Sequence, residues 1–221
     1  MLQIHLSKAL AKELKECVSP QKNADPQALQ FYAQLTDIEG ERTIVLMELQ
    51  SRYALLFCGV SDYHIEHFQD IVQERLWREV CAIAELGQDL PEKELAVLSD
   101  TVLGLTEQQY FQEGHDPSVG SHIRSVIEEL RSFNRHEDYE LPLHLDQAME
   151  FDFIVNNFVR KSRGGAEKFV PLEVFRDFWL GLLDVIWDSG GFDGENMQAD
   201  NRESKAQVIH VDFKNKKLRE D

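Results

Sequence analysis

The hydrophobic pattern of residues 29–86 changes its period once, and this change restricts the fold more than any other feature of the chain. In residues 29–36 apolar and polar side chains alternate, which is typical of a half-buried strand. Two more β-rich runs follow at 43–49 and 52–60, so three strands are predicted to form a meander. From residue 61 to about 86 the apolar residues instead recur at helical spacing, as Ile65, Phe68, Val72, Leu76, Val80 and Ile83. The sequence therefore predicts a sheet that is covered by a long helix.

The rest of the chain supplies further segments of both kinds. Alternating runs predict strands at 2–6 and 106–113, and caps with helical spacing predict helices at 8–15, 91–103, 116–133, 143–161 and 171–187. The whole is an α+β fold, with a small, mostly antiparallel sheet that contains the three-strand meander. Several helices cover this sheet, and C-terminal helices follow.

The order of these segments predicts one domain and a tail. Residues 1–188 form the α+β domain, in which 1–133 are the core of sheet and helices and 141–188 complete it with two helices. These two helices are too apolar to stand alone as a helical hairpin. Residues 189–221 begin with a stretch rich in Gly, Asp and Asn, which predicts a flexible acidic tail. The alternating run at 206–213 predicts a strand in this tail that could add to a sheet edge.

The net charge excludes several classes of function. Of 221 residues, 40 are Asp or Glu and 23 are Lys or Arg, which gives a formal net charge of −17 at pH 7. General binding of nucleic acid needs a dense basic face, and anionic membrane surfaces attract basic segments, so neither is expected. An acidic surface favours a basic or nucleic-acid-binding protein partner instead.

The cysteines and the first residues point to a cellular compartment. Cys17, Cys58 and Cys81 form an odd set without regular spacing, which predicts neither a disulfide framework nor a zinc site. No basic region followed by an apolar one occurs at the start, so no signal peptide is expected. The longest apolar stretch, 53–60, is too short to span a bilayer. We therefore expect a reducing, cytoplasmic setting, no membrane association and no cofactor.

Four short motifs follow one another along the first 133 residues. They are Ser7-Lys8-Ala9-Leu10, Tyr32-Ala33-Gln34-Leu35, Arg52-Tyr53-Ala54 and Asp116-Pro117-Ser118-Val119-Gly120-Ser121. In this order the motifs resemble a bacterial domain family of unknown function. The sequence around Leu145, Asn156 and 171–175 is somewhat similar to the same family. The resemblance implies the fold and a bacterial origin, and it implies no activity.

Two histidines in the long predicted helix form a candidate metal site. His64 and His67 are three residues apart, and Asp70 lies one turn further along as a third ligand. Helical geometry separates them, because His64 flanks the apolar stripe whereas His67 and Asp70 lie on the polar side. A solvated helix face with local pairing of histidine and carboxylate is therefore the favoured interpretation.

The start of the helix predicted at 116–133 is a candidate anion site. Asp116 at the N-cap and Pro117 at the first helical position are typical of an ordinary helix start, and this interpretation is favoured. Free amide groups at a helix N-terminus can also bind an anion. Such a site would be lined by Ser118, Ser121 and His122.

A basic cluster at the end of the helix predicted at 143–161 also has two interpretations. It consists of Arg160, Lys161 and Arg163, and two glycines follow it. Cations in a last helical turn complement the carbonyl end of the helix, and glycine then ends it, so a helix stop is favoured. The alternative is a contact with phosphate or with an acidic partner, in which these residues would reach into the anion site.

The helix predicted at 171–187 is apolar over most of its circumference. Such a helix is either central in the core or covered by another chain. The core is the favoured interpretation, and the alternative is an interface with a second copy or a partner. That interface would include Phe175, Phe178, Trp179, Leu182 and Trp187.

These features together favour a non-enzymatic function. The sequence contains no recognised catalytic motif, whereas the apolar last helix and the tail strand both offer surfaces for another protein. We therefore predict a protein-interaction or regulatory module with a protein partner or as a homodimer. The alternative is an enzyme or sensor that acts on a small phosphate-like anion at the helix N-terminus between Asp116 and His122.

Overall fold

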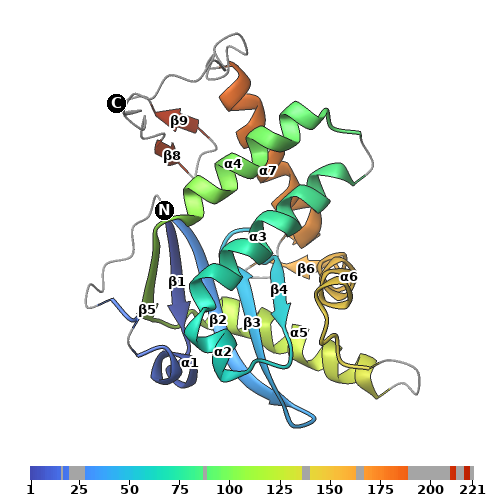
Figure 1. Cartoon of the computed structure of the whole chain (residues 1–221). Coiled ribbons are helices and arrows are strands. Elements are labelled where there is room, and N and C mark those ends of the chain that lie inside the picture. The colour runs from blue at the N-terminus through green and yellow to red at the C-terminus, as the bar shows by residue number, and fades with distance from the viewer. Residues whose placement is uncertain are drawn as a thin grey trace.

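A computed structural model describes most of the chain. The described residues are 1–15, 17–19, 28–86, 89–135, 140–162, 167–188, 210–212 and 217–219. Figure 1 shows their arrangement, with a central sheet and helices on both of its faces.

The central sheet has five strands in the order β4-β3-β2-β1-β5. Its strands are β1 (Leu2–Leu6), β2 (Leu29–Ile38), β3 (Glu41–Glu48), β4 (Ala54–Phe57) and β5 (Gln109–Glu113). Strands β2, β3 and β4 form the predicted antiparallel meander. Strand β1 runs parallel to both β2 and β5. The α+β class is confirmed, but the sheet is mixed rather than mostly antiparallel, because helical crossovers return the chain to the same direction before β2 and before β5.

Seven helices surround this sheet in the described part of the chain. They are α1 (Lys8–Glu13), α2 (Asp62–Glu66), α3 (Phe68–Glu85), α4 (Glu92–Thr106), α5 (Pro117–Asn134), α6 (Leu145–Asn156) and α7 (Pro171–Asp188). Four short strands complete the described elements: β6 (Arg160–Lys161), β7 (Lys168–Phe169), β8 (His210–Asp212) and β9 (Lys217–Arg219).

Two predicted helices differ from the observed ones. The helix expected at 61–86 is broken at His67, whose φ of −106° and ψ of 24° are not helical. No residue of α2 is buried, whereas α3 begins with buried Phe68, so the break lets α3 turn onto the sheet. The helix expected at 143–161 ends at Asn156. Arg160 and Lys161 therefore belong to strand β6, and their interpretation as a last helical turn is wrong.

Two hydrophobic cores lie on opposite faces of the sheet. Alternate residues of the strands point to each face, so Ile44 and Leu46 enter one core while Val45 and Met47 enter the other. Residues of α1, α3, α4 and α7 build the first core, and residues of α5 and α6 build the second. In Figure 1, α3 lies over one face and α5 crosses the other. The helices of residues 141–188 thus pack onto the same two cores as residues 1–133.

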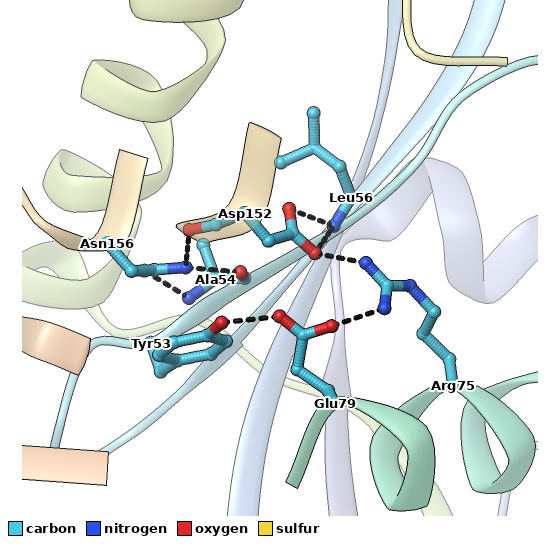
Figure 2. Close-up of polar contacts among 7 residues, drawn as sticks. All are labelled: Tyr53, Ala54, Leu56, Arg75, Glu79, Asp152 and Asn156. Atoms are coloured by element: carbon cyan, nitrogen blue, oxygen red, sulfur yellow. Dashed lines mark hydrogen bonds and ion pairs between the residues drawn. The ribbon is translucent and has the colours of Figure 1, made fainter. Parts of the chain in front are cut away.

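Helix α6 takes the place of a neighbouring strand at the edge of the sheet. Asn156 Oδ1 accepts the Ala54 N–H at 2.8 Å, and Asn156 Nδ2 donates to the Ala54 carbonyl at 2.8 Å. One turn earlier, the carboxylate of Asp152 accepts the N–H of Leu56 at 3.1 Å. Figure 2 shows these contacts along β4. The backbone of this edge strand is thereby satisfied, and the edge is closed to pairing with another chain.

A buried ion network continues from this edge. Arg75 of α3 donates to Glu79 and to Asp152, and the Tyr53 hydroxyl donates to Glu79 (Figure 2). Both carboxylates are fully buried and Arg75 is 3% exposed. Burial raises the pKa of Asp152 well above its ordinary value, and Arg75 opposes that shift. The network joins α3 on one face to α6 at the edge, so it connects the two cores.

We expect Asn156→Ala to destabilise the protein by about 2–4 kcal/mol, because it leaves the N–H and carbonyl of Ala54 buried without partners. Urea unfolding measures the loss, and faster hydrogen exchange at the Ala54 amide locates it. Asn157→Ala is the control, because Asn157 is the next residue and is exposed. Equal stability of the two variants would contradict the edge-closing role of Asn156.

The C-terminal strand of the tail is only partly within the described residues. Strand β8 covers residues 210–212 of the run predicted at 206–213, and it pairs antiparallel with β9 in a sheet of two strands. The predicted flexible acidic stretch at 189–204 lies outside the described residues.

Candidate functional site

A polar pocket lies at the carboxyl ends of the parallel strands β1 and β5. It has a volume of about 290 Å³, and its walls include His5, Ser7, Lys8, Tyr32, His115 and Asp116. Helix α1 follows β1 into the first core, whereas α5 follows β5 into the second. The chain therefore leaves two adjacent parallel strands toward opposite faces, and ligands of open α/β sheets bind at such a point.

His5 forms one wall of this pocket and is held on both sides of its ring. Gln112 Nε2 lies 3.2 Å from His5 Nδ1, and Gln30 Oε1 lies 3.3 Å from His5 Nε2. An amide nitrogen is a donor, so Nδ1 accepts, and Nε2 carries the hydrogen that it donates to Gln30. Tyr32 stacks on the ring at 4.4 Å. Burial lowers the pKa of His5, which keeps the ring neutral in this arrangement.

Gly114 allows the backbone after β5 to approach His5. A Cβ at this position would lie 2.6 Å from His5 Nδ1 and 3.0 Å from His5 Cβ. The Gly114 N–H donates to the Leu6 carbonyl at 3.1 Å, which fixes the end of β5 against the end of β1. Only glycine permits this spacing, so the pocket depends on the residue type here.

The first turn of α5 is capped as the sequence predicts. Asp116 Oδ1 accepts the N–H of Ser118 at 2.8 Å and of Val119 at 2.9 Å, and Pro117 follows the cap. The carboxylate thus occupies two of the amide groups that a bound anion would use. Anion binding at this end of α5 therefore has to come from side chains.

Arg52 is a second cationic side chain near this pocket, whose lining already includes Lys8. Its Nη2 lies 3.4 Å from Ser118 Oγ, and no acceptor among the described residues contacts its buried Nη1. Burial lowers the pKa of Arg52, whereas the nearby Glu48, Asp116 and Tyr32 raise it. Tyr32 and Asp116 both line the pocket, so the guanidinium lies next to it.

The backbone at Arg52 is held in a left-handed conformation with φ of 61°. A buried carboxylate organises this turn, since Glu48 accepts the N–H of Gln50 at 2.8 Å and the hydroxyl of Ser51 at 2.7 Å. Non-glycine residues in such a conformation cluster at functional sites, because the surrounding structure has to sustain the strain. The turn therefore holds Arg52 near Tyr32 and Asp116 at an energetic cost.

The basic segment after α6 lies against α5. His122 is hydrogen-bonded to the backbone of Lys161, and burial together with the nearby Arg160 and Arg52 lowers the pKa of His122 to about 4. Arg160 is 5% exposed and donates to the Val155 carbonyl at 3.3 Å. Of the residues predicted from sequence, Ser118 and His122 therefore lie near Arg52, whereas Arg160 and Lys161 lie near His122. Ser121 is exposed, and Arg163 lies outside the described residues.

The two histidines of the predicted metal site have separate local contacts. His64 Nδ1 accepts the Ser61 N–H at 3.0 Å and completes the cap of α2. His67 lies at the break before α3, where its ring packs on Tyr63 at 4.4 Å. Among the described residues, no group of three His, Cys, Asp or Glu side chains is placed to hold a metal ion, so the structure does not bring His64, His67 and Asp70 together.

The residues predicted for an interface on the last helix divide into two sets. Phe175, Trp179 and Leu182 are buried in the first core of the same chain. Phe178 and Trp187 are partly buried against that core, and Lys93 lies 4.9 Å from the Trp187 ring. A partner at α7 would contact the second set only.

A family model for DUF6933, a domain of unknown function, matches residues 3–173. The chain belongs to the DUF6933 family. The match confirms the resemblance to an uncharacterised family, and it includes α6 and the first turn of α7, where the sequence is somewhat similar to that family. The DUF6933 domain therefore contains the whole polar pocket and Arg52. A search of curated proteins finds no match.

None of the described helices is both long and apolar enough to cross a membrane.

Sequence reasoning missed His5, Tyr32 and Arg52 as members of the site. His5 and Tyr32 occupy the polar positions of alternating strands, which sequence alone assigns to a solvent-exposed face. The one sequence signal for this site is that the polar residues on this face include several glutamines, namely Gln3, Gln30 and Gln112. Two of them, Gln30 and Gln112, contact the His5 ring. No local sequence pattern marks Arg52 as a site residue, because the residues near it at the pocket come from distant segments of the chain.

Proposed function

We propose that the chain binds a small phosphate-like anion in the polar pocket and acts as a sensor or regulatory protein. The observation that carries this proposal is the buried Nη1 of Arg52. This nitrogen is a charged donor near the pocket, and no acceptor among the described residues contacts it. A guanidinium that lacks a partner binds phosphate or carboxylate oxygens strongly, because both the charge and the geometry match. The left-handed backbone of Arg52 adds the strain that is typical of functional positions.

The charges around the pocket limit the ligand to a small anion. Lys8 lines the pocket and Arg52 lies near its residues Tyr32 and Asp116, whereas the lining residues Asp116 and Glu113 are anionic, so the pocket and its surroundings have little net charge. A highly charged anion would be repelled by the two carboxylates, and the overall charge of −17 adds to this repulsion. The volume of about 290 Å³ suits a ligand at the lower end of the usual range.

Hydrogen bonding within the site favours binding over catalysis. Both ring nitrogens of His5 have glutamine partners. Asp116 caps α5, and His122 is tied to the Lys161 backbone. A general acid or base needs to exchange a proton with its substrate, and groups that are already engaged in the fold are poorly suited to this. The site therefore resembles a recognition surface more than a proton-transfer centre.

Titration with inorganic phosphate, followed by NMR of the histidine rings, tests this proposal. We expect saturable shifts at His5 and His115 in the original protein. Arg52→Gln should weaken phosphate binding about tenfold or more, because a charge-assisted hydrogen bond is lost. Arg124→Gln is the matched control, since Arg124 is exposed on the same helix α5, and it should leave binding unchanged. Equal affinity of the two variants would refute the role of Arg52.

A protein partner or a homodimer is the second proposal, and exposed apolar side chains support it. Phe158 is 41% exposed and Val159 is 62% exposed, in the segment between α6 and β6. Adjacent exposed apolar residues of this size are typical of interaction surfaces. Phe178 and Trp187 on α7 offer a second partly buried contact surface. A regulatory protein can combine this surface with the anion site.

We also infer a bacterial, cytoplasmic protein, and the thiols support the cytoplasmic location. All three cysteines are free, and Cys17 is exposed. Exposed free thiols persist in reducing compartments. Burial raises the pKa of Cys58 to about 12, which disfavours the nucleophilic thiolate form.

A further inference from the structure

A second pocket lies on the other side of the molecule from β5, where α3 faces the edge strand β4. Its volume is about 210 Å³. The walls are mainly apolar and include Leu56, Phe57, Val60, Phe68, Leu143 and Ala148. They come from the sheet edge, from α3, from α6 and from the segment that precedes α6. An apolar cavity of roughly 150 Å³ already holds a molecule of the size of benzene, so this pocket accommodates a slightly larger one.

The pocket has one unusual polar group in its wall, the guanidinium of Arg75. The two terminal nitrogens of Arg75 donate to Glu79 and Asp152, as Figure 2 shows. The third nitrogen, Nε, is buried, and no acceptor among the described residues contacts it. A buried donor without a partner is rare in folded proteins, because it has lost its bond to water. Arg75 is also one of the residues that line the pocket.

The charges behind the pocket indicate which kind of acceptor fits. Arg75 contacts two carboxylates, Glu79 and Asp152, and the three groups carry no surplus of positive charge. Glu74 also lines the pocket. An anionic ligand would therefore meet at least as much negative as positive charge. A neutral oxygen, such as that of a ketone or an ester, accepts a hydrogen bond without this repulsion.

The rim of the pocket provides an entrance. Leu143 is 51% exposed and Leu145 is 39% exposed, and both belong to the lining. Exposed apolar side chains at the mouth of a pocket are typical of a ligand site.

We propose that this pocket binds a small neutral molecule with an apolar body and one acceptor oxygen, which takes the hydrogen bond of Arg75 Nε–H. This proposal is independent of the anion site, since the two pockets share no lining residue.

Three probes of similar size test the proposal by NMR titration of the methyl groups of Leu143 and Ala148. Acetophenone is neutral and carries a carbonyl oxygen, α-methylstyrene replaces that oxygen with a methylene group, and benzoate carries a negative charge. We expect acetophenone to bind about tenfold more tightly than α-methylstyrene, because only acetophenone can accept from Nε. We expect benzoate to bind more weakly than acetophenone. Equal binding of the two neutral probes, tighter binding of benzoate, or no binding of acetophenone would each overturn the proposal.

A pocket-filling variant locates the binding. Ala148→Leu places three more carbon atoms in the pocket and should reduce acetophenone binding about tenfold or more. Ala11→Leu makes the same change on α1, outside the pocket, and should leave the affinity unchanged. Thermal unfolding of both variants verifies that they are folded before titration. Unchanged binding in a folded Ala148→Leu variant would place the ligand elsewhere and overturn the assignment.

Discussion

Arg75→Met should destabilise the protein by about 3–5 kcal/mol at neutral pH, as is typical when one partner of a buried ion pair is removed. The substitution leaves the carboxylates of Glu79 and Asp152 buried without their cation. Urea unfolding measures the loss. Arg78→Met is the control on the same helix, because Arg78 forms an exposed pair with Glu74 at 2.8 Å. That control should cost about 0–1 kcal/mol.

The effect of Arg75→Met should depend on pH. Burial raises the pKa values of Glu79 and Asp152, and Arg75 opposes that rise, so both values increase further in the variant. The folded variant then binds more protons than the unfolded chain at pH values above the unfolded carboxylate pKa values of about 4. Its free energy of unfolding therefore falls as the pH rises through that region. The difference from the original protein should shrink toward pH 4, and a difference independent of pH would contradict the network as described.

Trp179→Ala should cost about 3–5 kcal/mol, because it removes a large side chain from a site that cannot refill. Trp179 is fully buried, and Phe175 and Phe178 pack on its ring with centroids at 6.0 Å and 5.1 Å. Trp187→Ala is the control near the end of α7, where the ring is only partly buried, and it should cost clearly less. Thermal and urea unfolding of both variants provide the comparison.

The same two variants test whether α7 also contacts a second chain. A helix that packs within its own chain gives an unfolding midpoint independent of protein concentration, whereas an obligate dimer does not. If a homodimer forms through Phe178 and Trp187, light scattering should show that Trp187→Ala shifts the equilibrium between dimer and monomer toward the monomer. If the loss of stability in Trp179→Ala depended on protein concentration, and that in Trp187→Ala did not, the placement of Trp179 in the first core would be contradicted.

Local patterns in the sequence predicted much of the secondary structure. The alternation in residues 29–60 predicted the meander, and Asp116 with Pro117 predicted the start of α5, where the cap contacts residues two and three positions further along. These features depend on neighbours in the chain, so their signal is contained in short windows. The long helices could be predicted for the same reason. The break at His67 could not, because it depends on how Phe68 packs against the sheet.

The sites were decided by the tertiary structure. Asn156 and Asp152 reach backbone groups 102 and 96 residues away, and no local pattern marks either residue as the partner of an edge strand. His5 and Tyr32 meet at one pocket because β1 pairs with β2 in parallel register, and β5 brings Glu113 and the following Asp116 to the same place. A polar residue on an alternating strand looks the same in sequence whether it faces water or a buried second face. The sequence by itself therefore determined which segments become strands and helices, whereas only the pairing of distant strands decided which polar side chains meet.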